Sequence, residues 1–443
     1  MANRYAPTAR GILRAAFALA ALGVSVAALA QSPTKPQSVD DIISNVLKDN
    51  KDDAAPRLGK HAVEPVIMGV RIGEHQDRTR FVVEMSDPVA MRTFTLSNPN
   101  RVVIDMPLVQ WHLEAAPRPT GNGIVRSYRY GLFRSGNSRF VIDLNSPVTV
   151  SNALVVPPGG GYGYRVVVDL FPTSQDKFNA TAGWPPDLRA REAAAALLAS
   201  LPPNQSQLPQ AGEKHIIVID AGHGGIDSGT NGVNGLQEKD VVLDEAQRLG
   251  RALAARSGYV VHLTRESDVY IPLKERVSIA RNWHADLFVS LHADSNPDPS
   301  VTGLSIYTLS ERGSDAEAAA LARKENQSDV IAGVDLGGGN STVAPILIDL
   351  AQRDTMNRSS RFAEGAVSLL ARATGILPKQ PHRSAAFVVL KAPDVPSVLI
   401  ELGYLSNSGD ADQMNSAHWR DRMARAIAGA IDRYFGPSTV ADP

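Results

Sequence analysis

The sequence has no cysteine among its 443 residues, which excludes disulfide bonds and thiolate chemistry. It also lacks a surplus of either charge, since 45 lysines and arginines stand against 46 acidic residues and the formal net charge is −1. A chain this close to neutral has no overall basic field that would draw it to nucleic acid. With 43% apolar and 21% charged residues it is neither disordered nor fibrous, and its length allows two or three domains with their own cores.

The sequence also lacks an apolar run long enough to span a membrane. The alanine- and leucine-rich stretch at 15–29 is too short for a transmembrane helix. Three arginines and no acidic residue precede it, namely Arg4, Arg10 and Arg14. Residues 1–30 are therefore interpreted as a secretory signal peptide, with an uncleaved anchor as the alternative. Cleavage of the signal peptide would bring the net charge from −1 to about −4 and leave no anchor. The polar, proline-bearing residues 31–62 are expected to form a flexible lead-in.

Residues 63–172 consist of short apolar stretches broken by proline, glycine and asparagine, and they nearly repeat. RFVVEMSDPV at 80–89 returns as RFVIDLNSPV at 139–148, and RVVIDMP at 101–107 returns as RVVVDLFP at 165–172. Two copies of a strand pair predict two similar sheets packed face to face, a small all-β sandwich, because one sheet alone could not bury its apolar side. A chance likeness between two β-rich segments is the alternative.

Arginines alternate with aromatic residues between the two copies, and no acid occurs from residue 119 to 142. Arg126, Arg129 and Arg134 are candidates for a surface that pairs with the anionic groups of a polymer while the aromatic rings stack on its sugars. A solvated strand face is the alternative, and nucleic acid would suit the same residue types. The signal peptide favours the cell wall as the polymer.

A proline-punctuated linker with one short helix, residues 173–213, precedes a region of different periodicity, residues 214–436. Its apolar strands are expected at 215–220, 258–263, 286–291, 303–309 and 397–402. Its helices are expected near 238–256, 272–284, 356–374 and 416–434. This alternation predicts an α/β domain with a mostly parallel sheet, whose site lies at the carboxyl ends of the strands.

Histidines follow two of these strands. His223 stands in the glycine-rich turn of HIIVIDAGHGG, His292 ends the strand in ADLFVSLHAD, and Glu238 opens a helix in LQEKD. Two imidazoles and a carboxylate on one rim are typical of a catalytic zinc site that keeps its fourth position open. The glycine-rich turn would also suit a phosphate group, but the second histidine favours a metal.

Glu401 stands in the apolar stretch SVLIELG. An ionised carboxylate there is costly unless a charge lies beside it. One interpretation is a salt bridge to Lys391 or Arg383. The other is a general base for water on the metal.

Four stretches in this order closely resemble the zinc-dependent N-acetylmuramoyl-L-alanine amidases over residues 214–435: IDAGHGGIDSGTNGVNGLQEKD, LTRESD, LFVSLHAD and PSVLIELGYLSN. The β-repeat resembles the AMIN domain that accompanies this catalytic domain in cell-division amidases of the AmiC type. The resemblance implies one zinc ion per chain, bound by His223, Glu238 and His292, with Glu401 as the catalytic residue. It implies hydrolysis of the amide between N-acetylmuramic acid and L-alanine in peptidoglycan, for daughter-cell separation and wall remodelling.

The resemblance also implies a periplasmic monomer, placed in some relatives at the division septum, with peptidoglycan and a LytM-domain activator as partners and no nucleic acid. The general secretion route is expected rather than the twin-arginine route, because Arg10 and Arg14 are not adjacent. The ligand set alone leaves two rivals open. They are another exported zinc peptidase or deacetylase, and a wall-binding scaffold without activity.

The segment 310–350 is too long for an ordinary connection between a strand and a helix. A helix is expected in SDAEAAALARKENQSDVIAGV, followed by a glycine-rich hinge, DLGGGNSTVAP. The end of the strand at 303–309 is expected to face the zinc rim, so this helix can lie across the cleft and place Glu325, or as second choice Glu317, at the open zinc position. The resemblance agrees, since AmiC-type amidases carry a helix here that blocks the site until the activator displaces it. A surface insertion without function is the alternative.

Overall fold

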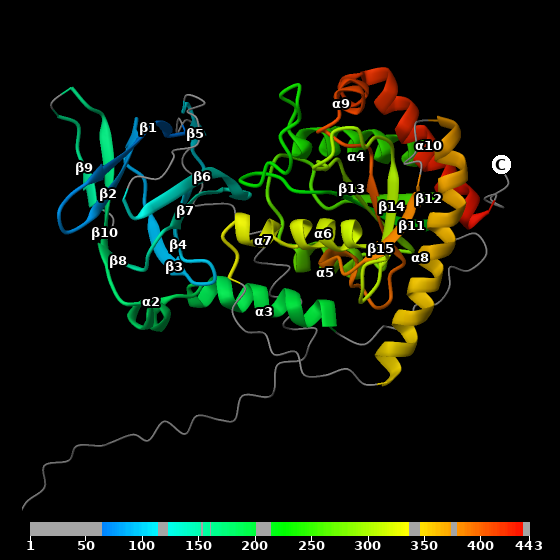
Figure 1. The fold of residues 1–443 in the computed structure, drawn as a ribbon, viewed down its shortest axis with the longest axis horizontal. Coiled ribbons are helices and arrows are strands. Elements are labelled where there is room, and N and C mark those ends of the chain that lie inside the picture. Colours follow the sequence, from blue (N-terminus) through cyan, green and yellow to red (C-terminus); the bar gives the residue numbers. More distant parts are fainter. Residues whose placement is uncertain are drawn as a thin grey trace, which may run out of the picture.

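The computed structural model describes residues 64–113, 123–151, 154–159, 161–200, 214–335, 346–373 and 379–436. The expected signal peptide (1–30) and lead-in (31–62) lie outside these residues. The described chain forms a β-rich N-terminal part and an α/β C-terminal part that lie against each other, with helix α3 running beneath both (Figure 1). Among the described helices, none combines the length and the hydropathy that crossing a bilayer requires.

Two sheets make up the N-terminal β domain. The first has the order β5-β1-β2-β10-β8, with β9 beside β10, and its strands are β1 (Val66–Glu74), β2 (Thr79–Met85), β5 (Gln110–Trp111), β8 (Val148–Val150), β9 (Leu154–Val156) and β10 (Tyr164–Pro172). The second has the order β3-β4-β7-β6, with β3 (Arg92–Leu96), β4 (Arg101–Pro107), β6 (Val125–Arg134) and β7 (Asn137–Leu144). Apolar side chains of both sheets meet in one core, which confirms the sandwich; among them are Phe81, Val83, Val102, Phe140 and Val166.

The two sequence copies do not form one sheet each. The RFV stretches are β2 and β7, and the RVV stretches are β4 and β10. Strand β2 pairs with β10, while β4 pairs with β7, both in antiparallel register. The two strands of one copy therefore lie in opposite sheets, and each sheet takes one strand from each copy.

The segment expected to be a linker contains two helices within its described part, α2 (Gln175–Thr181) and α3 (Pro186–Ser200), where one was expected. Helix α3 packs along α5 (Leu273–Asn282), and the Ser278 hydroxyl donates a hydrogen bond to the Ala195 carbonyl at 2.8 Å. Helix α3 is therefore attached to the C-terminal part, whereas α2 packs on the β domain, where Phe178 joins the core of the sandwich. Residues 201–213 lie outside the described residues.

The C-terminal part is built on a sheet of six strands in the order β12-β11-β13-β16-β14-β15. Its strands are β11 (His215–Ala221), β12 (Tyr259–Leu263), β13 (Leu287–His292), β14 (Ser305–Leu309), β15 (His382–Ala385) and β16 (Ser397–Glu401). The first four in the sheet order are parallel, while β14 runs antiparallel to β16 and β15 is parallel to β14. The mostly parallel sheet is confirmed. Strand β15, with the sequence HRSA, was not expected because it is too short and polar to show an apolar pattern.

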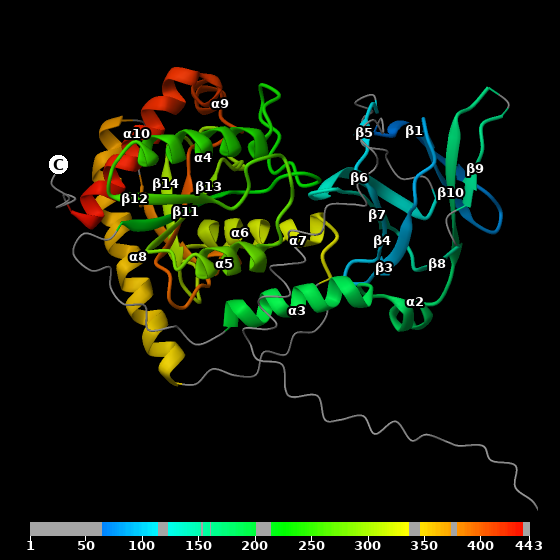
Figure 2. The ribbon, with the colours of Figure 1, turned by 180° about the vertical axis from the view of Figure 1, so that it is seen from behind.

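Helices cover both faces of this sheet (Figure 2). One face packs on α4 (Glu238–Ala254), α8 (Ile346–Ala373) and α10 (Ala417–Phe435), with α9 (Ser408–Asn415) between β16 and α10 along the chain. The other face packs on α5, α6 (Ala316–Glu325) and the short 3-10 helix at Val388–Leu390. Side chains alternate between these cores along each strand, so Ile217 and Ile219 face α4 while Val218 faces α5.

The insert at 310–350 contains α6 and α7 (Ser328–Ile331) and the start of α8. The expectation that strand 303–309 ends at the zinc rim was wrong. Because β14 is antiparallel to β16, its first residue, Ser305, pairs with Glu401, and its last residue points away from the rim. Helix α6, which is yellow in Figure 1, then returns along the sheet face that also carries α5, and its last residue, Glu325, reaches His223. Most of the expected hinge, residues 336–345, lies outside the described residues.

Candidate metal centre

Two histidines meet at the carboxyl ends of neighbouring parallel strands. His223 lies in the turn after β11 with a φ of 57°, and His292 is the last residue of β13. Their ring centroids are 5.0 Å apart, and both side chains are buried. A Cβ on Gly222 would come within 2.5 Å of the His292 ring. The glycine-rich turn therefore leaves the space that the second imidazole fills.

Glu238, the first residue of α4, joins the two histidines. Its Oε1 lies 3.1 Å from Nε2 of His223 and 3.2 Å from Nδ1 of His292. Backbone N–H groups hold the carboxylate in place, that of Thr230 at 2.8 Å and that of Ala293 at 2.9 Å. The three ligands that the sequence indicated thus converge on one point.

Glu325, at the end of α6, reaches the same point from the insert. Its Oε2 lies 3.3 Å from Nε2 of His223 and 3.1 Å from Nδ1 of His292. His223, His292 and Glu325 have ligand atoms that all lie within 4.8 Å of one another, and all three side chains are buried. Glu325 and Glu238 therefore share the same two imidazole nitrogens.

Opposite charges compensate each other in this cluster. Burial would lower the pKa of His223, but the carboxylates of Glu238 and Asp227 outweigh it and raise that pKa well above its usual value. Burial would likewise raise the pKa of Glu325, yet His292 and His223 lower it to about 2. The carboxylates thus require positive charge beside them, which is what a bound divalent cation provides.

The donor atoms fit a zinc ion. Three buried atoms at the centre have no hydrogen-bond partner, namely Nε2 of His223, Oε1 of Glu325 and Oε1 of Glu401. Buried polar atoms are seldom left without a partner, so such a group requires an explanation. Imidazole nitrogen and carboxylate oxygen are both ligands that zinc takes in proteins.

Glu401 ends strand β16 and lies in register with His292 on β13. Its Oε2 accepts a hydrogen bond from the Asp294 N–H at 2.9 Å, which leaves Oε1 without a partner. Burial raises the pKa of Glu401 well above its usual value; His292 opposes this, and the nearby carboxylate of Glu238 adds to it. Arg383, one of the two salt-bridge partners considered from the sequence, pairs with other acids.

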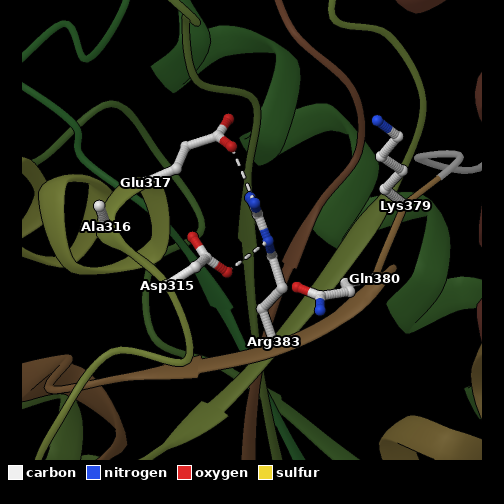
Figure 3. Close-up of a pocket in the computed structure, with 6 residues that line it drawn as sticks. All are labelled: Asp315, Ala316, Glu317, Lys379, Gln380 and Arg383. Atoms are coloured by element: carbon white, nitrogen blue, oxygen red, sulfur yellow. Dashed lines mark hydrogen bonds and ion pairs between the residues drawn. The ribbon is translucent and has the colours of Figure 1, made fainter.

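Those acids are at the start of α6. Arg383 lies between Glu317 at 2.8 Å and Asp315 at 3.1 Å, in the wall of a surface pocket of about 670 Å³ (Figure 3). The Asn296 side chain donates a further hydrogen bond to Glu317. Glu317, the second choice for a carboxylate at the zinc position, is therefore engaged away from the histidines, and the structure brings Glu325 there instead.

A buried network that the sequence did not reveal supports the histidine turn. Oδ2 of Asp227 lies 2.9 Å from Nδ1 of His223 and also accepts a hydrogen bond from Ser328 on α7. Arg276, paired with Asp220 at 2.8 Å, donates to the His223 carbonyl at 2.7 Å. A carboxylate behind a ligating histidine fixes its ring and tautomer. The available signal was the aspartate four residues after the histidine, in GHGGID.

The basic stretch of the β domain lies mostly at the contact with the C-terminal part. Arg129 donates to carbonyl groups at the end of α7, and Arg134 pairs with Glu275 of α5 at 3.3 Å. Arg126 bonds to Asn145 at the surface. Of the three residues considered for polymer binding, two are thus engaged within the molecule, and a role of this stretch in binding a polymer stays a prediction.

A mostly parallel α/β sheet with two histidines and a carboxylate gathered at its strand ends defines a metal-dependent hydrolase. The family model described as N-acetylmuramoyl-L-alanine amidase matches residues 217–433, and the AMIN domain model matches residues 69–170. The chain belongs to the N-acetylmuramoyl-L-alanine amidase family, and its activity is hydrolysis of the amide that joins N-acetylmuramic acid to L-alanine in peptidoglycan. Membership decides against the peptidase, deacetylase and scaffold alternatives.

Three relatives illustrate the extent of the similarity. The N-acetylmuramoyl-L-alanine amidase AmiC of Neisseria meningitidis serogroup B is 34% identical over 394 residues, which cover 87% of this chain and 94% of the relative. AmiC of Escherichia coli O6:H1 is 33% identical over 380 residues, covering 83% and 89%. AmiA of Escherichia coli K12 is 39% identical over 227 residues, covering 51% of this chain and 78% of the relative.

Proposed function

We propose that this amidase is a zinc enzyme in which His223, Glu238 and His292 hold the ion and Glu401 transfers the proton. The observation that carries the proposal is the convergence of buried donors, in which Glu238 Oε1 lies within 3.2 Å of a ring nitrogen of each histidine. Zinc supplies a Lewis acid for the amide carbonyl and makes water acidic enough to ionise near neutral pH.

Glu401 has the geometry of a general base and acid. The Asp294 N–H holds Oε2, so Oε1 is the oxygen that takes a proton from the attacking water and returns it to the leaving nitrogen of L-alanine. Burial raises the pKa of Glu401, which makes its protonated form accessible for the return step. The backbone of β16 fixes this carboxylate beside His292.

We infer that residues 316–334, which we call the gate, keep the metal centre closed. Glu325 places its carboxylate at both zinc-binding histidines, and Lys324 next to it bonds to Asp294 and to Thr230 at 3.0 Å. Helix α6 also lines a pocket of about 590 Å³ beside the centre, together with Asp294 and Tyr404. A preference of about 3 kcal/mol for this closed state would leave under about 1% of molecules open.

We assign the opening to a LytM-domain activator and the setting to the periplasm and the division septum, because the sequence resemblance to AmiC-type amidases and the expected signal peptide at 1–30 imply them. The domain limits we propose are 31–62 for the lead-in, 63–172 for the AMIN-like domain that binds peptidoglycan, 173–213 for the linker and 214–436 for the catalytic domain. The family models support the two folded parts.

Metal analysis together with digestion of purified peptidoglycan tests the proposal. We expect one zinc per chain in the parent and in His262→Ala, whose imidazole stacks on Trp283 away from the centre. His292→Ala should lose both the zinc and the release of intact stem peptides. An active His292→Ala protein that contains no zinc would refute the assignment.

A further inference from the structure

The carbonyl end of the gate is covered by the N-terminal β domain. Helix α7 ends in a turn at Gly333, which has a φ of 70°. The Gly333 N–H bonds to the Val330 carbonyl at 3.1 Å, and the Val334 N–H bonds to the Asp329 carbonyl at 2.8 Å. This pair of bonds ends many helices at a glycine, and it presents the carbonyls of residues 330–334 to donors from outside the helix.

Those donors are arginines from strands β4, β6 and β7, and we call Arg101, Arg129 and Arg139 the arginine face. Nη1 of Arg101 donates to the Val330 carbonyl at 2.8 Å, and Nη2 of Arg129 donates to the same oxygen at 3.2 Å. Nη1 of Arg139 donates to the carbonyl oxygens of Ala332 and Gly333, each at 3.1 Å. The contact is thus a set of charged donors on the negative end of a helix, which is electrostatically favourable.

Arg101 shows how far this surface depends on the gate. It is completely buried, and its donors reach carbonyl groups, those of Pro99 and Val330, rather than a carboxylate. Burial, together with the nearby guanidinium of Arg129, lowers the pKa of Arg101 to about 10. The other two arginines of the face each pair with an aspartate of their own sheet. Without the gate, the Arg101 guanidinium would lose its nearest partner outside its own turn.

The same contact is closely packed. Ala332 and Val334 belong to a buried apolar cluster that also contains Val103, Val141 and Trp184 of the preceding domain and helices. A Cβ added to Gly333 would lie 2.9 Å from Cγ2 of Val141, so there is no room for a side chain. The Trp184 indole N–H also donates to the Gly333 carbonyl at 3.2 Å.

A few residues connect this contact to the metal centre. Glu325 stands five positions before Val330. Between them, Ser328 donates to Asp227, which holds His223, and Asp329 accepts from the Tyr270 hydroxyl at 2.7 Å. A movement that withdraws Glu325 from the histidines must therefore also move the segment held by the arginine face.

We propose that the arginine face is an interaction surface for the carbonyl end of the gate, and that the gate leaves the metal centre only when this contact breaks. The N-terminal β domain thereby holds the amidase closed, in addition to any role in binding the wall. The proposal rests on the proposed function, because it requires that Glu325 blocks the centre.

Removal of two arginines tests it in the full-length, zinc-loaded protein. Without an activator, Arg101→Ala/Arg129→Ala should release stem peptides from purified peptidoglycan at least about tenfold faster than the parent, the factor that about 1.4 kcal/mol gives. A colorimetric chelator should also extract its zinc faster. Arg71→Ala is the matched control, because Arg71 is exposed on the other sheet and pairs with Glu84.

The Glu325→Ala variant distinguishes failure of the arginine-face proposal from failure of the gate itself. A fast Glu325→Ala protein beside an arginine variant at the parental rate would overturn the role of the arginine face and keep the gate. If both variants are folded by circular dichroism, loaded with zinc and as slow as the parent, the gate itself is wrong.

Discussion

Oε2 of Glu325 lies 3.1 Å from Nδ1 of His292, although one residue belongs to an inserted helix and the other to a central strand. The contact joins a carboxylate from the gate to a proposed zinc ligand. In the proposed mechanism the gate supplies a ligand atom of its own where a substrate oxygen or water is required. The same contact holds the insert against the centre and is the basis of its proposed blocking role.

Glu325→Ala should raise basal hydrolysis at least about tenfold without an activator, because the substitution removes the carboxylate that competes for the histidines. Release of stem peptides from purified peptidoglycan measures the rate. Glu317→Ala should raise it less, since Glu317 pairs with Arg383 at 2.8 Å and does not reach the centre. Equal increases from the two substitutions would show that the stability of α6 matters rather than the carboxylate.

Glu401→Gln should keep zinc and fold but lose at least about 100-fold in rate, because the amide cannot take a proton from water. The measurement is best made in the Glu325→Ala background, where basal activity is high enough to record a large loss. Zinc content and melting temperature serve as controls. An active Glu401→Gln protein would remove Glu401 from the mechanism.

Asp227→Ala should weaken zinc binding by about 10- to 100-fold, because Nδ1 of His223 loses the carboxylate that orients the ring at 2.9 Å. Competition with a zinc chelator measures the affinity. Ser328→Ala is the matched variant, since Ser328 contacts Asp227 from the gate side and does not touch the histidine. It should leave zinc affinity near the parental value. Equal losses in both variants would assign the effect to the gate.

Glu245 on α4 should make stability depend on pH. It is buried, neither carboxylate oxygen has a hydrogen-bond partner, and burial raises its pKa well above the usual value. The folded state therefore binds the proton more tightly than the unfolded state, and stability falls as pH rises from the ordinary glutamate range towards the raised pKa. Glu245→Gln should gain about 1 kcal/mol on the parent between pH 5 and pH 8 in urea unfolding. Asp412→Asn, at an exposed position, should show no such trend.

Sedimentation with purified peptidoglycan tests the basic stretch of the β domain. If it contributes to wall binding, Arg126→Ala should weaken sedimentation and raised salt should weaken it further. Arg126 bonds to Asn145 at the surface and, among the described residues, makes no hydrogen bond to the gate, so its removal leaves the contact with the gate intact. Unchanged sedimentation of Arg126→Ala together with Arg134→Ala would remove the stretch from the binding surface.

The sequence determined the two domain types and the position of the centre. The apolar runs before His223 and His292 are long enough to be buried strands, and parallel neighbours end at one edge of a sheet, so the two imidazoles had to come close. Indeed, β11 and β13 pair directly. Each site residue at a strand end is contiguous in sequence with the strand that holds it. Short motifs were therefore sufficient to reveal the family resemblance.

The tertiary structure alone decided the rest. Strand β14 lies antiparallel to β16, a direction that depends on a long-range pairing and not on any local pattern. The pairing of β2 with β10 and of β4 with β7, which places the two strands of each sequence copy in different sheets, likewise depends on long-range contacts. Arg129 was a candidate for polymer binding in the sequence, and Arg101 stood there only as the first residue of a repeat. The donors of both nevertheless meet carbonyl groups about two hundred positions later in the chain. Local periodicity reports which face of a strand is apolar, whereas the partner of a buried charge is set only when distant segments pack together.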